Sequence, residues 1–179
     1  MSIPQIPAGT WNVDPTHSRV GFVARHMMVT KVKGQFSDYT AKVEIGENPL
    51  ASSIEVEVQM ASVDTGNADR DGHLRTNDFF NVDEFPTMTF RSTSILSDGD
   101  DYTLTGELTI KGITKPVEFE LEFEGLGADP WGGTRAGFEA KTVIDRTDFG
   151  VEFNAALETG GVLLSDKVTI ELDIQLVKA

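Results

Sequence analysis

Residues 102–124 read YTLTGELTIKGITKPVEFELEFE, and apolar and polar side chains alternate in both halves of this stretch. A period of two residues predicts β-strands, and the short KGITKP connection predicts that the two strands pair antiparallel. The glutamates at 118, 120, 122 and 124 are interpreted as a solvent-exposed outer face. The opposite, apolar face carries Tyr102, Leu104, Gly106, Leu108, Ile110, Val117, Phe119, Leu121 and Phe123.

The same alternation recurs in both directions along the chain. About eight strands joined mostly by short turns are predicted, and no segment has the spacing of a β-α-β unit, which favours an all-β, antiparallel sheet. Such a sheet either packs as a sandwich or closes into a barrel. The other strand-like segments are residues 16–27, 32–45, 54–61, 88–92, 137–142 and 168–176, with a glycine-rich loop predicted at 125–137.

One long segment lacks the strand rhythm: residues 69–92, which read DRDGHLRTNDFFNVDEFPTMTFRS. A short helix is predicted near residues 68–80, with Thr65, Asn67 or Asp69 as its N-cap. Arg70 and Arg75 are expected to form ion pairs with the neighbouring aspartates. Long irregular segments in compact domains are usually functional, so this one is expected to close an end of the sheet.

An eight-stranded barrel is just wide enough to hold one small ligand. The predicted inner face is rich in aromatic residues, which by itself also fits a solidly filled core. Small residues on the same face, such as Ala24, Ala41 and Ala140, favour a cavity. The segment rich in phenylalanine is then a candidate lid.

Composition limits the classes of function. The chain of 179 residues suits a single domain, residues 1–179. Its 29 acidic and 15 basic residues give a formal charge of -14, which opposes binding to nucleic acid or to anionic membranes. No cysteine is present, and no apolar run is long enough to span a bilayer. The opening MSIPQIPAGTW does not have the pattern of a signal peptide, so a soluble, cytoplasmic protein is expected.

Few polar residues stand out as candidates. His17 is expected to pair with Asp14 in a structural turn, or else to donate to a ligand headgroup. The three histidines, His17, His26 and His73, do not have the spacing of a zinc site, so no metal is expected. Arg146 in VIDRTDFG is expected to pair with an adjacent aspartate that caps a turn, or to form a polar contact at the barrel mouth.

Four blocks of the sequence resemble the YceI-like family, the lipocalin-like polyisoprenoid-binding proteins. In chain order they are WNVDPTHSRVGFVARH from Trp11, DRDGHLRTNDFFNVDEFPTMTF from Asp69, YTLTGELTIKGITKPV from Tyr102 and GFEAKTVIDRTDFG from Gly137. The resemblance implies an eight-stranded antiparallel, lipocalin-like barrel whose apolar tunnel holds a long isoprenoid chain, such as that of a prenyl quinone or polyprenyl phosphate. Many relatives are exported to the periplasm, and this chain departs from them in its start.

The resulting hypothesis is non-catalytic binding, storage or transport of an isoprenoid lipid, without a cofactor or stable membrane insertion. A homodimer is favoured, because barrels with exposed edges or apolar mouths often pair. One alternative is an enzyme acting on a hydrophobic small molecule, with His17, Arg75 and Arg146 as its polar groups; another is an interaction module with a filled core. The predicted ligand contacts are His17, Phe22, Phe36, Met60, Arg75, Phe79, Phe80, Met88, Phe90, Tyr102, Leu104, Leu108, Phe119, Phe138 and Arg146.

Overall fold

The computed structural model describes residues 5–27, 29–154 and 164–179, which form eleven strands, one α-helix and four 3-10 helices. The strands are β1 (Gly9–Val13), β2 (Arg19–His26), β3 (Thr30–Phe36), β4 (Tyr39–Ile45), β5 (Ser53–Gln59), β6 (Val63–Asp64), β7 (Thr87–Asp98), β8 (Asp101–Ile110), β9 (Ile113–Ala128), β10 (Thr134–Asp145) and β11 (Lys167–Lys178). The helices are η1 (Pro15–His17), η2 (Pro49–Ala51), η3 (Met60–Ser62), α1 (Ala68–Arg75) and η4 (Arg146–Phe149).

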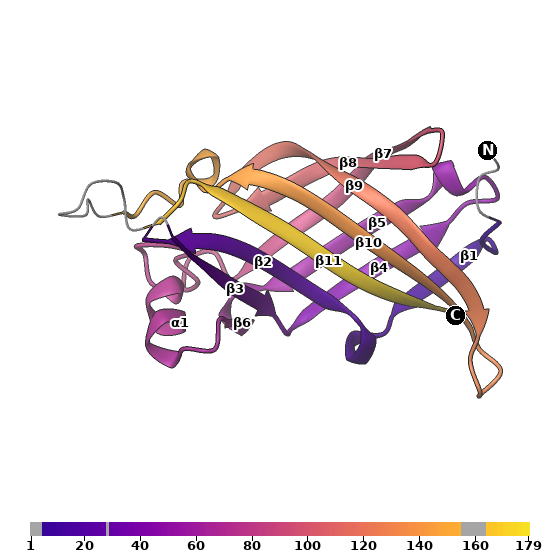
Figure 1. Cartoon of the computed structure of the whole chain (residues 1–179), viewed down its shortest axis with the longest axis horizontal. Helices are drawn as coiled ribbons and strands as arrows, with labels where there is room; N and C mark the ends of the chain where they lie inside the picture. The colour runs from indigo at the N-terminus through magenta and orange to yellow at the C-terminus, as the bar shows by residue number, and fades with distance from the viewer. Residues whose placement is uncertain (1–4, 28, 155–163) are drawn as a thin grey trace.

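The sheet closes on itself. Neighbouring strands follow the order β1, β4, β5, β7, β8, β9, β10, β11, and β11 pairs again with β1. Trp11 lies opposite both Val43 on β4 and Lys178 on β11, so β1 is paired on both sides. The result is an elongated barrel with α1 at one end and the C-terminal end of β11 at the other (Figure 1).

The eleven labelled strands form a barrel of eight strands, because three of the barrel strands are each divided into two labelled parts. Strand β2 continues β1 beyond η1, β4 continues β3 beyond residues 37–38, and β6 continues β5 beyond η3. The neighbours are kept across the breaks, since β1 and β2 pair with β4 and β3, respectively. The predicted eight-stranded antiparallel barrel is confirmed, and the sandwich alternative is wrong.

Side-chain alternation separates the inside of the barrel from the outside. Val117 and Phe119 on β9 are buried, whereas Glu118 and Glu120 between them are exposed. Leu104 on β8 lies opposite Phe119, so the apolar faces of neighbouring strands meet inside. The predicted outer face of glutamates is therefore confirmed.

The helix α1 lies within the predicted range but ends earlier, at Arg75. Asn67 is its N-cap, with a side-chain oxygen that accepts a hydrogen bond from the Arg70 backbone N–H at 3.0 Å. Phe79 follows in a turn and is buried, and Phe80 packs against the same core. In Figure 1, α1 lies at the end of the barrel beside β3 and β6.

The expected ion pairs of Arg70 and Arg75 with aspartates are wrong. Arg70 donates to the hydroxyl and the carbonyl of Thr65 at 2.7 and 2.9 Å, and Asp71 accepts from the Thr65 backbone N–H at 2.9 Å. Arg75 donates to the carbonyl of Ala61 at 3.1 Å. Backbone groups in the chain before α1 are not paired within a sheet and need hydrogen-bond partners. The charged side chains of α1 bond to these backbone groups instead of to one another.

The predicted loop at 125–137 is also wrong, because β9 and β10 extend through most of it. Gly125 adopts a φ of 152°, a value that favours glycine, and the register of the pair shifts at Gly137. A bulge of this kind lets two strands continue past a local irregularity. Only residues 129–133 form the turn, in which the Asp129 carboxylate accepts from the Gly133 N–H at 2.7 Å.

The break between β1 and β2 is held by Asp14. Its carboxylate accepts from the Thr16 backbone N–H at 3.0 Å and contacts His17 Nδ1 and Arg135 Nη1, each at 2.7 Å. Arg135 in turn donates to Asp129 at 3.0 Å. The bonds from His17, and next those from Arg135, lower the pKa of Asp14 from 3.8 to about 2.

Glycine at position 106 is required by close packing. A Cβ there would lie 2.4 Å from the ring of Phe90 and 2.5 Å from the carbonyl oxygen of Arg91. We expect Gly106→Ala to lower the free energy of unfolding by about 1–3 kcal/mol, measured by urea denaturation, because the backbone oxygen has little room to move. Gly127→Ala is the matched control, since a Cβ on that glycine of β9 meets no atom within 4 Å. Equal stability of the two variants would contradict this account.

Asp14 is expected to contribute to the decrease in the free energy of unfolding at low pH. Its folded pKa lies below its unfolded value, so its contribution is complete above about pH 5 and is lost as the pH falls towards 2. Because part of the site is open to solvent, we expect the loss to be about 1–2 kcal/mol. Asp14→Asn should therefore lose less stability than the wild type between pH 5 and pH 2.5, as measured by urea denaturation. Asp100→Asn, an exposed carboxylate in the β7–β8 turn, should follow the wild-type curve.

Candidate functional site

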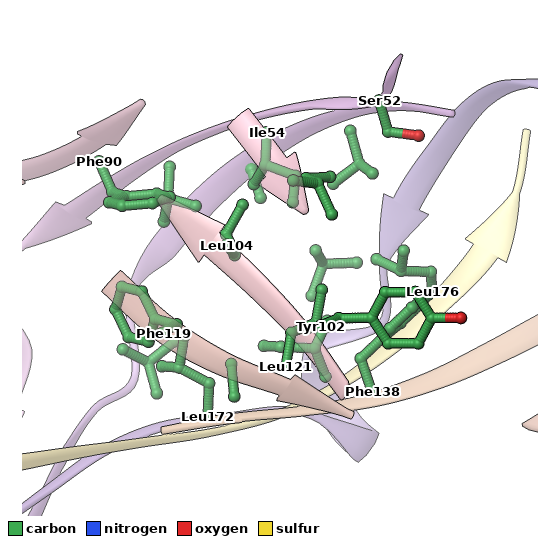
Figure 2. Close-up of a pocket in the computed structure, with 18 of the residues that line it drawn as sticks. Ser52, Ile54, Phe90, Tyr102, Leu104, Phe119, Leu121, Phe138, Leu172 and Leu176 are labelled. Atoms are coloured by element: carbon green, nitrogen blue, oxygen red, sulfur yellow. The ribbon is translucent and has the colours of Figure 1, made fainter. Parts of the chain in front are cut away.

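The barrel encloses a cavity of ≈ 190 Å³, named here the large cavity. Figure 2 shows Ile54, Phe90, Leu104, Phe119 and Leu121 around it, contributed by β5, β7, β8 and β9. These residues point inward because each occupies the buried phase of the two-residue alternation. The lining is almost wholly aliphatic and aromatic.

Polar groups in the large cavity are few and neutral. Among the described residues, no charged side chain lines it, and the lining residues that carry a polar side-chain atom are Ser52, Thr89, Tyr39 and Tyr102. The hydroxyl oxygen of Tyr39 is itself buried in the wall. In Figure 2, the oxygens of Ser52 and Tyr102 lie on one side of the cavity, away from Phe90. Such a lining suits an apolar ligand that carries few polar atoms.

A further cavity of ≈ 150 Å³, the helix-end cavity, lies where α1 covers the barrel. Leu74 of α1 lines it, and Phe79 and Phe80 line it from the turn that follows. Val20, Met88 and Ile170 line both cavities, so the two adjoin. Together they form an elongated apolar space along the barrel, and the hypothesis of a solidly filled core is wrong.

Most of the predicted contact residues lie around this space. Met88 lines both cavities. The large cavity is also lined by Phe90, Tyr102, Leu104, Leu108, Phe119 and Phe138. The helix-end cavity is also lined by Phe22, Phe36, Met60, Phe79, Phe80 and Arg146.

Two predicted contact residues, His17 and Arg75, line neither cavity. The side chain of His17 is 61% exposed and pairs with Asp14, which confirms the structural turn. Arg75 donates to a carbonyl in η3 instead of facing inward. The three polar groups of the enzyme alternative, His17, Arg75 and Arg146, are therefore not brought together around one cavity.

Arg146 lines the helix-end cavity, but its guanidinium donates its hydrogen bonds to backbone carbonyls. It is 5% exposed, and it donates to the carbonyls of Ser165, Val151 and Phe153 at 2.9, 2.7 and 2.9 Å. Burial lowers the pKa of its guanidinium, an effect that Asp166, at 3.6 Å, opposes. The planar fork of donors links the residues that follow η4 to the residues that precede β11.

The predicted ion pair between Arg146 and an adjacent aspartate is wrong, although the predicted cap is confirmed. Asp145 accepts from the Thr147 backbone N–H at 3.0 Å and so caps η4. Its charged neighbour is Lys167, at 3.6 Å. The strand direction explains this difference, because Asp145 lies directly opposite Lys167 in the β10–β11 pair.

Several lining residues did not appear among the predicted contacts. Ile54, Leu121 and Leu172 line the large cavity, and the period of two would have placed them there. Tyr39 begins β4 in phase with Ala41, so the same period points it inward. Arg70 lines the helix-end cavity although Arg75 does not, a choice that sequence spacing could not make.

The described residues include one group of acidic side chains that could gather around a cation, Glu124, Glu139 and Asp173. All three are exposed on the outer wall of the barrel, away from both cavities. Repulsion by Glu124, the largest effect, raises the pKa of Glu139. No helix among the described residues is long and apolar enough to cross a membrane.

The closed antiparallel sheet and its apolar cavity place the protein in the class of small β-barrels whose interior has room for one small hydrophobic ligand. The family model described as the YceI-like domain matches residues 11–176. The chain therefore belongs to the YceI-like family, as the four sequence blocks predicted.

Individual relatives agree in sequence and fold. The chain is 44% identical to Protein YceI of Escherichia coli over 137 residues, 76% of this chain and 72% of that protein. The crystal structure of BcnA from Burkholderia cenocepacia superposes with a TM-score of 0.80 at 26% identity, covering 92% of this chain and 99% of that one. A structure described as a polyisoprenoid binding domain from Saccharophagus degradans shares the fold, with a TM-score of 0.70 at 18% identity over 94% of this chain and 98% of that one.

Replacing Arg146 should test its structural role. We expect Arg146→Lys to lower the free energy of unfolding by about 2 kcal/mol, because one ammonium group cannot satisfy three separately placed carbonyls. Arg75→Lys is the control, since Arg75 serves a single carbonyl near the surface. Urea denaturation of both variants gives the comparison. Unchanged stability of Arg146→Lys would mean that the carbonyls do not depend on the guanidinium.

Proposed function

We propose that this protein binds and carries a long-chain isoprenoid lipid without chemically changing it. The isoprenoid chain occupies the large cavity and extends past Val20, Met88 and Ile170 into the helix-end cavity. A prenyl quinone or a polyprenyl phosphate would supply such a chain.

The observation that carries this proposal is the elongated apolar space within the barrel. Its large part is lined without a charged side chain among the described residues. Burial contributes roughly 0.8 kcal/mol for each methylene removed from water, so several isoprene units would bind through their hydrocarbon alone. Two adjoining cavities fit an extended chain better than a compact molecule.

The family membership supports the same class of ligand. A barrel of the same fold is described as a polyisoprenoid binding domain, which is consistent with an isoprenoid cargo here. The separation of His17, Arg75 and Arg146 favours binding over catalysis, because general acid–base chemistry needs groups within reach of one reacting atom.

Lipid analysis of the native protein tests the proposal directly. Organic extraction of freshly purified protein, followed by mass spectrometry, should yield an isoprenoid lipid that is missing from an equally treated control protein. Delipidated protein should also take up a prenyl quinone or a prenyl phosphate from detergent micelles. Absence of lipid in the extract together with no uptake of either probe would overturn the proposal.

Filling the cavity should block uptake without breaking the barrel. Ala41 lines the large cavity, so Ala41→Phe places a ring in the space the lipid needs, and we expect uptake to fall by at least about tenfold. Thr40→Phe is the matched control, because the neighbouring residue of β4 is exposed on the outer wall. Micelle uptake and circular dichroism would be measured for both. Full uptake by a folded Ala41→Phe variant would contradict a ligand in this cavity.

A further inference from the structure

The β2–β3 hairpin differs in charge from the rest of the chain. Residues 15–37 contain two arginines and two lysines and no Asp or Glu, although the whole chain carries 29 acidic residues. In the pairing of β2 with β3, Arg25 lies directly opposite Lys31, and Val23 lies opposite Lys33. The three cations of this group, Arg25, Lys31 and Lys33, are exposed and are named here the basic face.

The inner side of the same hairpin lines a lipid-sized space. Ala24, His26 and Val32 line the helix-end cavity, so the residues that alternate with them, the basic face, point away from it. Figure 1 shows the connection from β2 to β3 at the end of the barrel where α1 lies. The helix-end cavity and the basic face are therefore the two sides of one hairpin.

The turn of the hairpin exposes apolar side chains. Val29 is 76% exposed and Met27 is 48% exposed, and these two residues are named here the apolar tip. Val143 on β10 is also exposed and lies three strands away in the cross-strand row that contains Lys33. Apolar groups flanked by cations are typical of surfaces that enter the headgroup layer of a membrane, where the cations meet lipid phosphates.

Acidic side chains on the neighbouring strands do not cancel the charge of the basic face. Asp145 at the end of β10 lies 3.6 Å from Lys167, and Asp166 lies 3.6 Å from the guanidinium of a buried arginine in η4. Asp64 on β6 lies opposite Gln35 and so borders the basic face at one edge. The outer side of the hairpin keeps a local positive charge on an acidic protein.

We propose that the basic face and the apolar tip form a docking surface for a membrane that contains anionic lipids. This inference rests on the proposed function, since a carrier has to collect and deliver its lipid at a membrane. The cations contact lipid phosphates, Met27 and Val29 enter the headgroup layer, and the helix-end cavity lies next to the bilayer. The contact is peripheral and reversible.

The net charge of -14 does not prevent such contact. At physiological ionic strength, charges are screened over about 8 Å, so a membrane in contact with the hairpin responds to the basic face more than to distant carboxylates. Each Lys or Arg near an anionic surface raises the affinity roughly fivefold. An acidic protein would also attract the cations, but the apolar tip and the adjoining cavity favour a membrane.

Vesicle flotation tests the inference. Wild-type protein would be mixed with vesicles of phosphatidylcholine alone, or of equal parts phosphatidylcholine and phosphatidylglycerol, and the floating protein would be measured over a range of lipid concentrations. We expect much stronger binding to the anionic vesicles, and loss of most of it when the ionic strength is raised from about 0.15 M to about 1 M. Equal binding to the two kinds of vesicle would contradict the role of the basic face.

Removal of two cations locates the contact. The double variant Lys31→Gln, Lys33→Gln should bind anionic vesicles at least about tenfold more weakly than the wild type. The matched control, Lys42→Gln with Arg91→Gln, loses the same charge from exposed positions on β4 and β7 and should bind nearly as the wild type does. Circular dichroism would check that both are folded. Equal affinities of the two double variants would overturn the placement of the membrane on this hairpin.

The apolar tip is tested by Val29→Ser. We expect it to bind anionic vesicles about threefold to tenfold more weakly, because less apolar surface enters the headgroup layer. Leu96→Ser is the control, since Leu96 is also exposed but lies on β7, outside the hairpin. Equal effects of the two substitutions would contradict insertion of the tip.

Failure of this inference and failure of the proposed function give different results. Wild-type protein that takes up a prenyl quinone from detergent micelles but does not float with anionic vesicles would overturn the docking surface alone, and would leave an acidic protein as the partner of the basic face. Wild-type protein that floats with anionic vesicles but takes up no prenyl lipid would overturn the proposed function alone.

Discussion

Closure of the sheet through the pairing of β11 with β1 is the constraint on which the rest of the structure depends. Once eight strand positions meet in a ring, the inward side chains face one another across a fixed distance. Aromatic residues such as Phe90 and Phe119 occupy much of that space, yet two cavities remain. A sandwich of the same strands would have packed its faces together and left no elongated space.

The positions of the charged side chains follow from that closure. Charged side chains bond to the backbone where the regular pairing is interrupted or ends: the half-buried Asp14 holds the break between β1 and β2, and the buried Arg146 bonds carbonyls beyond the end of β10. Each satisfies backbone groups that the sheet leaves unpaired. Among the residues that the structure describes, no charged side chain lines the large cavity.

Much of the fold and of the cavity lining was predictable. The two-residue period placed Phe22, Leu104 and Phe138 on the inner face, and the four sequence blocks indicated the family. The polar residues were predicted less well, because charge and spacing do not reveal partners. Arg75 was chosen over Arg70 although the two are close in the chain, since only the direction of each side chain on α1 separates them.

The sequence alone determined the strands, their inner and outer faces and the position of the short helix, because alternation, turn residues and capping act over a few neighbouring residues. Only the tertiary structure decided that the sheet closes and that the interior stays partly empty. These properties depend on contacts between residues far apart in the chain, such as Val13 with Leu176, and no local pattern records the distance across a barrel.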